Sequence, residues 1–143
     1  MVLLLLNVKY WFDDPFSPHQ IVSWLLMSIS LVMVWQGIAS LLHLGNPDPI
    51  RNDAPLIGFE KTTALVTAGI YRYIRHPIYS SLLFLGWGLF FKHPTWTGVL
   101  LSLAASAFLI FTARAEEGEN LHYFGESYRA YMKRSKRFIP FVV

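Results

Sequence analysis

The chain has 143 residues, one domain's worth of sequence, so we treat residues 1–143 as a single domain. Hydrophobic residues make up 54% of it and charged residues only 15%, whereas a soluble domain carries about 25% charged residues. This composition indicates membrane burial. The absence of cysteine excludes disulfides and cysteine-ligated metals, and a net charge of +3 is too weak to indicate a nucleic-acid partner.

The N-terminal segment, residues 1–12, begins with an apolar run that lacks the features of a signal peptide. No basic residue precedes the run, the run is short, and no small-residue cleavage site follows it. Tyr10 and Trp11 stand where an aromatic belt is expected at a membrane surface. We therefore expect this segment to be interfacial or partly buried.

Three apolar stretches are predicted to cross the membrane, at residues 21–44, 77–91 and 95–112. The first is long enough, because about 20 helical residues cover a hydrocarbon core, and Pro18 stands at a plausible helix start. Only residues 92–94 separate the second stretch from the third, so these two should form an antiparallel hairpin. The predicted fold is an all-α integral membrane protein with about three transmembrane helices.

The distribution of positive charge orients these spans. With three spans, segments 45–76 and 113–143 share one side of the membrane, and they hold all but two of the 12 lysine and arginine residues. By the positive-inside rule that side is cytosolic, so the C-terminus and any site there should face the cytosol. The tail from Leu121 onward repeats apolar residues at helical spacing and ends in basic ones, which predicts an amphipathic helix on an anionic leaflet.

Two polar motifs should meet at the cytosolic ends of the hairpin. The sequence R-H-P-I-Y covers Arg75–Tyr79, and A-R-A-E-E covers Ala113–Glu117. Counted from Pro94, His76 and Glu116 lie roughly 27 and 33 Å along their helices, and packed helices are about 8–10 Å apart. The arginine-histidine pair and the two glutamates are therefore expected to face one pocket.

Structural explanations for the same residues remain open. Glu116 and Glu117 could pair with Arg72 or Arg75 only to neutralise charge near lipid. His76 precedes Pro77, and a residue before proline is pushed out of the helical region, so it could simply mark a helix boundary. The other histidines lack the spacing of H-x-x-H or H-E-x-x-H, so no metal site is expected.

The motifs also resemble those of a known family. The run L-V-T-A-G-I-Y-R-Y-I-R-H-P-I-Y at Leu65–Tyr79 resembles the signature of the isoprenylcysteine carboxyl methyltransferase family, whose wider group includes phospholipid methyltransferases. Glu116–Tyr131 is similar to the family's paired acids followed by F-G-x-x-Y-x-x-Y, and R-F-I-P at Arg137–Pro140 is similar as well. The resemblance covers about residues 58–140.

The resemblance implies a membrane methyltransferase that uses S-adenosylmethionine without a Rossmann fold and acts on a membrane lipid or lipidated substrate. It also implies which residues line the cofactor. Carried over by position, these are Thr63, Ala64, Leu65, Val66, Tyr71, His76, Pro77, Ile78, Tyr79 and Glu116.

One departure from the family pattern concerns the acceptor. Carboxyl-methylating members place a substrate-binding arginine four residues before the cofactor glutamate, and here that position is Thr112. Either Arg114 or Arg75 takes the role, or the substrate is not a carboxylate. A carboxylate needs no base at neutral pH, whereas an amine would, and Glu117 is then the candidate base.

Two other functions compete with this interpretation. Membrane sterol reductases that use NADPH carry a related R-H-P-x-Y motif, but they are longer and are not expected to show the second block at residues 116–131. A non-enzymatic membrane scaffold with a degenerate pocket is the other alternative. Binding of the cofactors would separate the three.

Overall fold

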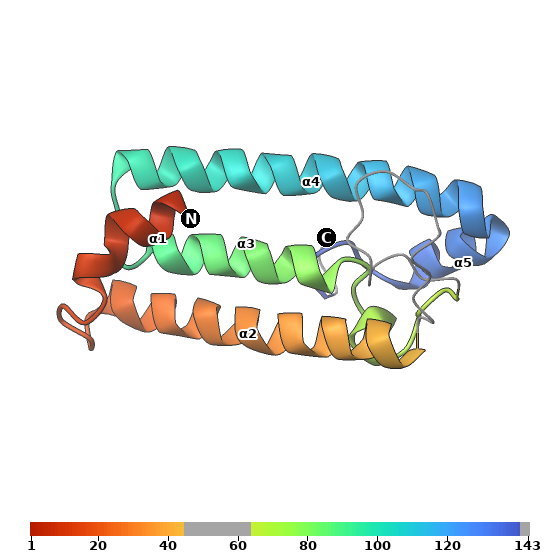
Figure 1. The fold of residues 1–143 in the computed structure, drawn as a ribbon, viewed down its shortest axis with the longest axis horizontal. Coiled ribbons are helices and arrows are strands. Elements are labelled where there is room, and N and C mark those ends of the chain that lie inside the picture. The colour runs from red at the N-terminus through yellow and green to blue at the C-terminus, as the bar shows by residue number, and fades with distance from the viewer. Residues whose placement is uncertain (45–63, 141–143) are drawn as a thin grey trace.

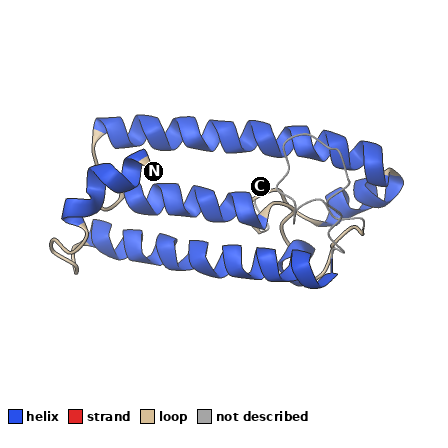
Figure 2. Ribbon diagram, in the orientation of Figure 1, coloured by secondary structure: helices blue, strands red, loops and turns tan. Residues whose placement is uncertain are grey.

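The computed structural model describes residues 1–44 and 64–140 of the chain. Helices are the only regular elements among these residues, which confirms the all-α prediction (Figure 2). The elements in chain order are α1 (Val2–Asn7), η1 (Val8–Tyr10), α2 (Pro18–Leu44), η2 (Gly69–Arg72), α3 (Pro77–Phe90), α4 (Trp96–Phe124) and α5 (Glu126–Arg134). The three longest, α2, α3 and α4, run side by side along the length of the molecule (Figure 1).

Two of these helices, α2 and α4, are long and apolar enough to cross a membrane, and α3 is a shorter apolar helix. Helix α2 begins at Pro18, as the sequence predicts. With 27 residues it is about 40 Å long, more than the roughly 30 Å hydrocarbon core.

Small residues bring α2 and α3 close together. Ser23 Oγ donates to the carbonyl of Gly88 and Ser30 Oγ to that of Ser81, both at 2.7 Å. A Cβ added at Gly88 would lie 2.8 Å from the Met27 side chain and 3.3 Å from backbone atoms of α2. Small and hydroxyl-bearing residues therefore allow close packing and satisfy polar groups between two apolar helices.

Helices α3 and α4 run in opposite directions and are joined by a short link (Figure 1). The Thr95 side chain caps α4 by accepting a hydrogen bond from the backbone nitrogen of Gly98 at 3.1 Å. The helix continues to Phe124, beyond the expected end of the apolar stretch at Thr112. Residues 113–124 are mostly good helix formers and include no proline, and the single glycine among them, Gly118, is accommodated within the helix.

The N-terminal segment docks against the α3–α4 link. Asn7 is buried, and its Nδ2 donates to the carbonyl of Leu89 at 2.8 Å. Gln20, which is fully buried, donates to the carbonyls of Tyr10 and Lys92 and accepts from Lys92 Nζ at 2.9 Å. These bonds hold the second half of the segment at the end of the bundle farthest from α5 (Figure 1).

After α5 the chain passes back along the residues that precede α3. We call residues 135–138 the C-terminal strap. The backbone nitrogen of Arg75 donates to the carbonyl of Lys136 at 2.8 Å, and that of His76 to the carbonyl of Arg137 at 3.1 Å. The strap therefore holds the R-H-P-I-Y motif against the rest of the chain.

Candidate functional site

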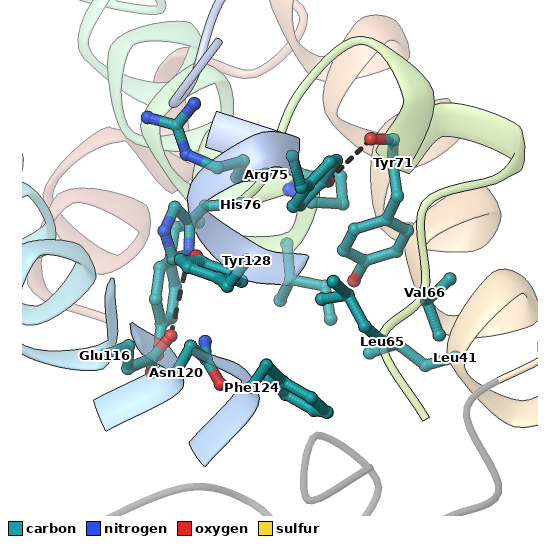
Figure 3. A pocket seen from close by; sticks show the side chains of 14 residues that line it. Leu41, Leu65, Val66, Tyr71, Arg75, His76, Glu116, Asn120, Phe124 and Tyr128 are labelled. Carbon is teal, nitrogen blue, oxygen red and sulfur yellow. Dashed lines mark hydrogen bonds and ion pairs between the residues drawn. The ribbon is translucent and has the colours of Figure 1, made fainter. Parts of the chain in front are cut away.

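The local sequence places His76 at the start of α3. Its backbone has φ −123°, outside the helical region, and Pro77 occupies the first helical position, as expected for a residue before proline and for proline at a helix start. The His76 side chain is buried, with 7% of the residue exposed, and it points toward α4 (Figure 3).

The structure brings the two polar motifs together. His76 Nδ1 lies 3.6 Å from Glu116 Oε2, and His76 Nε2 lies 3.5 Å from Glu117 Oε1. The Tyr79 hydroxyl donates a hydrogen bond to Glu116 Oε1. The imidazole thus lies between the two glutamates of α4, as the helical spacing indicates.

Glu117 is the most heavily paired acid in the described part of the chain. Arg75 Nε donates to its Oε1 at 2.8 Å. Arg137 donates to it from Nε at 3.1 Å and from Nη2 at 2.5 Å. Only 4% of Glu117 is exposed, and a buried carboxylate is tolerated when charged donors satisfy it in this way.

A pocket opens beside Glu116 and encloses about 80 Å³. Glu116, Asn120 and Phe124 lie along one side of it (Figure 3). Its walls combine carboxylate, guanidinium, imidazole and phenol side chains with aliphatic ones. It is lined by Leu41, Leu65, Val66, Tyr71, Arg75, His76, Pro77, Ile78, Tyr79, Glu116, Asn120, Phe124, Tyr128 and Tyr131.

Most of the residues expected to line the cofactor are in this pocket, but three of the described residues predicted for the site are not among its lining. Ala64 is described but is not part of the lining. Arg114 is exposed on α4. Glu117 faces Nε2 of the His76 ring, whereas the pocket-lining Glu116 faces Nδ1. Thr63 lies outside the described residues.

The structure adds five lining residues that the sequence motifs did not assign to the site. Asn120 and Phe124 follow Glu116 by four and eight positions on α4, a spacing that places them on the same helical face. That spacing was the available signal. Leu41 comes from α2, and no spacing argument connects it to the site.

Tyr128 and Tyr131 are the other two additions, and they change the interpretation of the tail. The apolar spacing predicted a helix face lying on lipid, yet these residues are 3% and 2% exposed and belong to the pocket lining. The Tyr131 hydroxyl donates to the carbonyl of Tyr71 at 2.6 Å. The apolar face of α5 therefore packs inward and forms part of the pocket wall.

Burial and charge set the ionisation of these groups. Burial by itself lowers the pKa of His76, but Glu116 and Glu117 together outweigh it, so the pKa is raised above its ordinary value. Burial raises the pKa of Tyr128 to about 12. The hydrogen bonds from Arg137 to Glu117 raise the pKa of the Arg137 guanidinium. Near neutral pH, Tyr128 is therefore a neutral hydroxyl and Arg137 a cation.

The family model for phospholipid methyltransferases matches residues 19–127, and the chain therefore belongs to the phospholipid methyltransferase family. This membership confirms the resemblance seen in the motifs, and with the two apolar helices it indicates a membrane protein.

Individual relatives carry a more specific name. The chain is 37% identical over 90 residues to human protein-S-isoprenylcysteine O-methyltransferase, a match covering 57% of this chain and 29% of the relative. The mouse protein of the same name is 34% identical over 83 residues, covering 57% and 29%, and the Xenopus laevis protein 34% over 87 residues, covering 54% and 27%. The chain thus matches less than a third of each relative's length. No solved structure matches it significantly.

Proposed function

We propose that this chain is an integral membrane methyltransferase that uses S-adenosylmethionine and methylates a lipid-like acceptor. The observation that carries the proposal is the pocket in which His76, Tyr79 and Glu116 meet at one end of a bundle of apolar helices. Membership of the phospholipid methyltransferase family and the names of the isoprenylcysteine relatives support it.

The side chains of the pocket fit the chemistry of this cofactor. Glu116 supplies a carboxylate that can accept hydrogen bonds from an ammonium group or from ribose hydroxyls, and a ligand doing so would compete with the Tyr79 hydroxyl. The rings of Tyr71, Tyr128 and Tyr131 offer faces on which adenine or a sulfonium cation can pack. The enclosed volume of about 80 Å³ is below the 300–1,000 Å³ of typical ligand sites, so binding would also require movement of these walls.

In the proposed reaction S-adenosylmethionine supplies a methyl group: the acceptor's lone pair forms the new bond to carbon as the sulfur–carbon bond breaks, leaving S-adenosylhomocysteine. The protein's contribution to such a displacement is chiefly alignment of the reacting atoms. His76 and Tyr79 serve this role by fixing the Glu116 carboxylate from two directions.

The state of Glu117 bears on the class of acceptor. Its carboxylate already accepts from two guanidinium groups, and it does not line the pocket, so it is poorly placed to remove a proton. An acceptor that arrives without a proton to lose, such as an isoprenylcysteine-type carboxylate, suits this arrangement better than a phospholipid amine. Arg114, exposed two residues before Glu116 on α4, is the proposed partner for such a carboxylate.

The proposal includes a membrane topology. We assign α2, α3 and α4 as three spans of a single domain, with the N-terminus outside and α5 and the pocket on the cytosolic side. Helix α3 has 14 residues and is therefore about 21 Å long, shorter than the roughly 30 Å core. Its His76 end would then lie below the cytosolic membrane surface, where a lipid-like acceptor could reach the pocket from within the leaflet.

Calorimetric titration of the detergent-purified protein with S-adenosylhomocysteine, and with NADPH in parallel, tests the proposal. We expect saturable binding of S-adenosylhomocysteine and none of NADPH. Binding of NADPH alone would favour a reductase, since sterol reductases share the R-H-P-x-Y motif. Binding of neither ligand would favour a scaffold without catalysis.

A further inference from the structure

Glu117 joins three segments of the chain without facing the pocket. Its carboxylate is on α4, Arg75 belongs to the loop before α3, and Arg137 belongs to the C-terminal strap. The two carboxylate oxygens together accept four hydrogen bonds from these arginines. A charge buried to this degree is costly, so its position calls for a role besides ligand binding.

His76 lies between the two acids of α4. Its Nδ1 faces Glu116 at 3.6 Å and its Nε2 faces Glu117 at 3.5 Å. Only the imidazolium form carries hydrogen on both nitrogens, so two carboxylates on opposite sides of the ring suit the charged form. The other charged or titratable groups around the cluster are Arg75 on the same loop, Tyr79 on α3, Tyr128 on α5 and Arg137 on the strap.

The balance of positive and negative charge around His76 depends on the Glu117 carboxylate. Arg75, Arg137 and a protonated His76 supply three positive charges, and Glu116 and Glu117 supply two negative ones. With Glu117 neutralised, Glu116 would be the one negative charge left in this cluster to balance the two arginines and the imidazolium, and protonation of His76 would become less favourable. The second glutamate is therefore what makes the charged imidazole stable beside the first.

The same carboxylate secures the strap. Arg75 Nη1 donates to the carbonyl of Ser135 at 2.5 Å, while Arg137 on the strap binds Glu117 directly. The strap in turn places the Phe138 ring 6.0 Å from the His76 ring, and Ser80 Oγ donates to the Phe138 carbonyl at 2.8 Å. Loss of the Glu117 charge would release the strap and the histidine together.

We propose that Glu117 is a positioning residue: its charge holds His76 between the two acids and fastens the C-terminal strap, while Glu116 is the acid that faces the ligand. The inference rests on the proposed function only for the identity of that ligand. The arrangement of Glu117, His76 and the strap is independent of it.

Titration of His76 by NMR tests the inference directly. The protein, labelled at the Cε1 carbons of its five histidines, is titrated in detergent, and His76→Gln identifies the His76 signal. In Glu117→Gln we expect the His76 midpoint to fall by about one pH unit or more, because a neighbouring opposite charge is lost. An unchanged midpoint would overturn the inference.

Two further variants keep the test decisive. Glu126→Gln is the matched control, because Glu126 forms an exposed ion pair with Arg129 in α5, and it should leave the midpoint unchanged. Arg137→Gln removes a cation bound to Glu117, so the less compensated carboxylate should hold the proton of His76 more tightly and the midpoint should rise. If Glu117→Gln fails to fold, an unmoved midpoint in Arg137→Gln overturns the inference instead.

Ligand binding separates this inference from the proposed function. We expect Glu117→Gln to bind S-adenosylhomocysteine on the order of tenfold more weakly than wild type, a loss of about 1.4 kcal/mol, with Glu126→Gln unchanged. Unaltered affinity in Glu117→Gln would contradict the positioning role. If the wild-type protein does not bind the ligand, the proposed function fails, and the histidine titration still decides the role of Glu117.

Discussion

At the site, Glu116 is the residue that most directly tests the proposed cofactor pocket. Glu116→Gln removes the negative charge but keeps the size of the side chain and an oxygen to accept the Tyr79 hydrogen bond. We expect the affinity for S-adenosylhomocysteine to fall by about tenfold or more, because a charged hydrogen bond contributes roughly 1.5–3 kcal/mol. Calorimetry measures the affinity, and circular dichroism checks that the helices are intact. Wild-type affinity in this variant would remove Glu116 from the cofactor site.

The protonation of His76 should make stability depend on pH. The pKa of His76 is raised in the folded protein above its ordinary value of 6.5, because Glu116 and Glu117 outweigh the effect of burial. A raised pKa means that the folded state binds the proton more tightly than the unfolded state does. The resulting stabilisation is fully present below the unfolded pKa and is lost as pH rises through the folded pKa.

Thermal unfolding in detergent from pH 5 to 9 measures this dependence. We expect the difference in Tm between wild type and His76→Gln to be largest at the acidic end and to shrink as pH rises. A difference that grows with pH would mean that His76 is neutral in the folded protein.

The part of the site that could be predicted is the part governed by helix geometry. Spacing along a helical hairpin was enough to expect His76 beside Glu116, and they lie 3.6 Å apart. The contribution of Arg137 to Glu117 was not predicted. It depends on the strap pairing with residues 73–76, a contact between distant segments that no local pattern encodes.

At the level of the helices, the corner between α4 and α5 depends on Gly125. Its φ is +56°, a left-handed conformation that side chains with a Cβ rarely adopt, and an added Cβ would meet nothing within 4 Å. Gly125→Ala should therefore destabilise the protein by about 1–2 kcal/mol through backbone strain alone. Thermal unfolding in detergent, compared with wild type, measures the effect.

Gly118 offers a matched control for that substitution. It lies within α4, has no positive φ, and an added Cβ there also meets nothing within 4 Å. Gly118→Ala should raise stability by about 0.5–1 kcal/mol, because alanine favours the helix over glycine. Equal effects of the two substitutions would mean that the corner is not strained.

The boundary of α4 shows why elements were predicted better than their ends. The third predicted span ends at Thr112, because the apolar run stops there, but the helix itself continues to Phe124. Membrane burial ends where polar residues begin, whereas a helix ends at a breaker, here Gly125. The inward packing of Tyr128 and Tyr131 was missed for a related reason, since an apolar helix face has the same spacing whether it meets lipid or protein.

For the whole molecule, the proposed topology places the two ends of the bundle on opposite sides of the membrane. The N-terminal segment docks on the α3–α4 link through Asn7 and Gln20, while α5 and the strap gather at the other end (Figure 1). The chain has no cysteine, so a single introduced cysteine reports its own location. Lys9 and Lys133 are exposed positions at the two ends.

We expect Lys9→Cys to react with a membrane-impermeant maleimide in intact cells, and Lys133→Cys to react only after the membrane is opened. The reason is the excess of basic residues near α5 and the pocket, because the positive-inside rule predicts that such an end faces the cytosol. Reaction of both variants from the outside, or of neither, would mean an even number of spans. Helix α3 would then be the span to reassign, because its 14 residues are fewer than the roughly 20 needed to cross a hydrocarbon core. It would become a re-entrant helix, and the pocket at its N-terminal end would lie within the membrane interface.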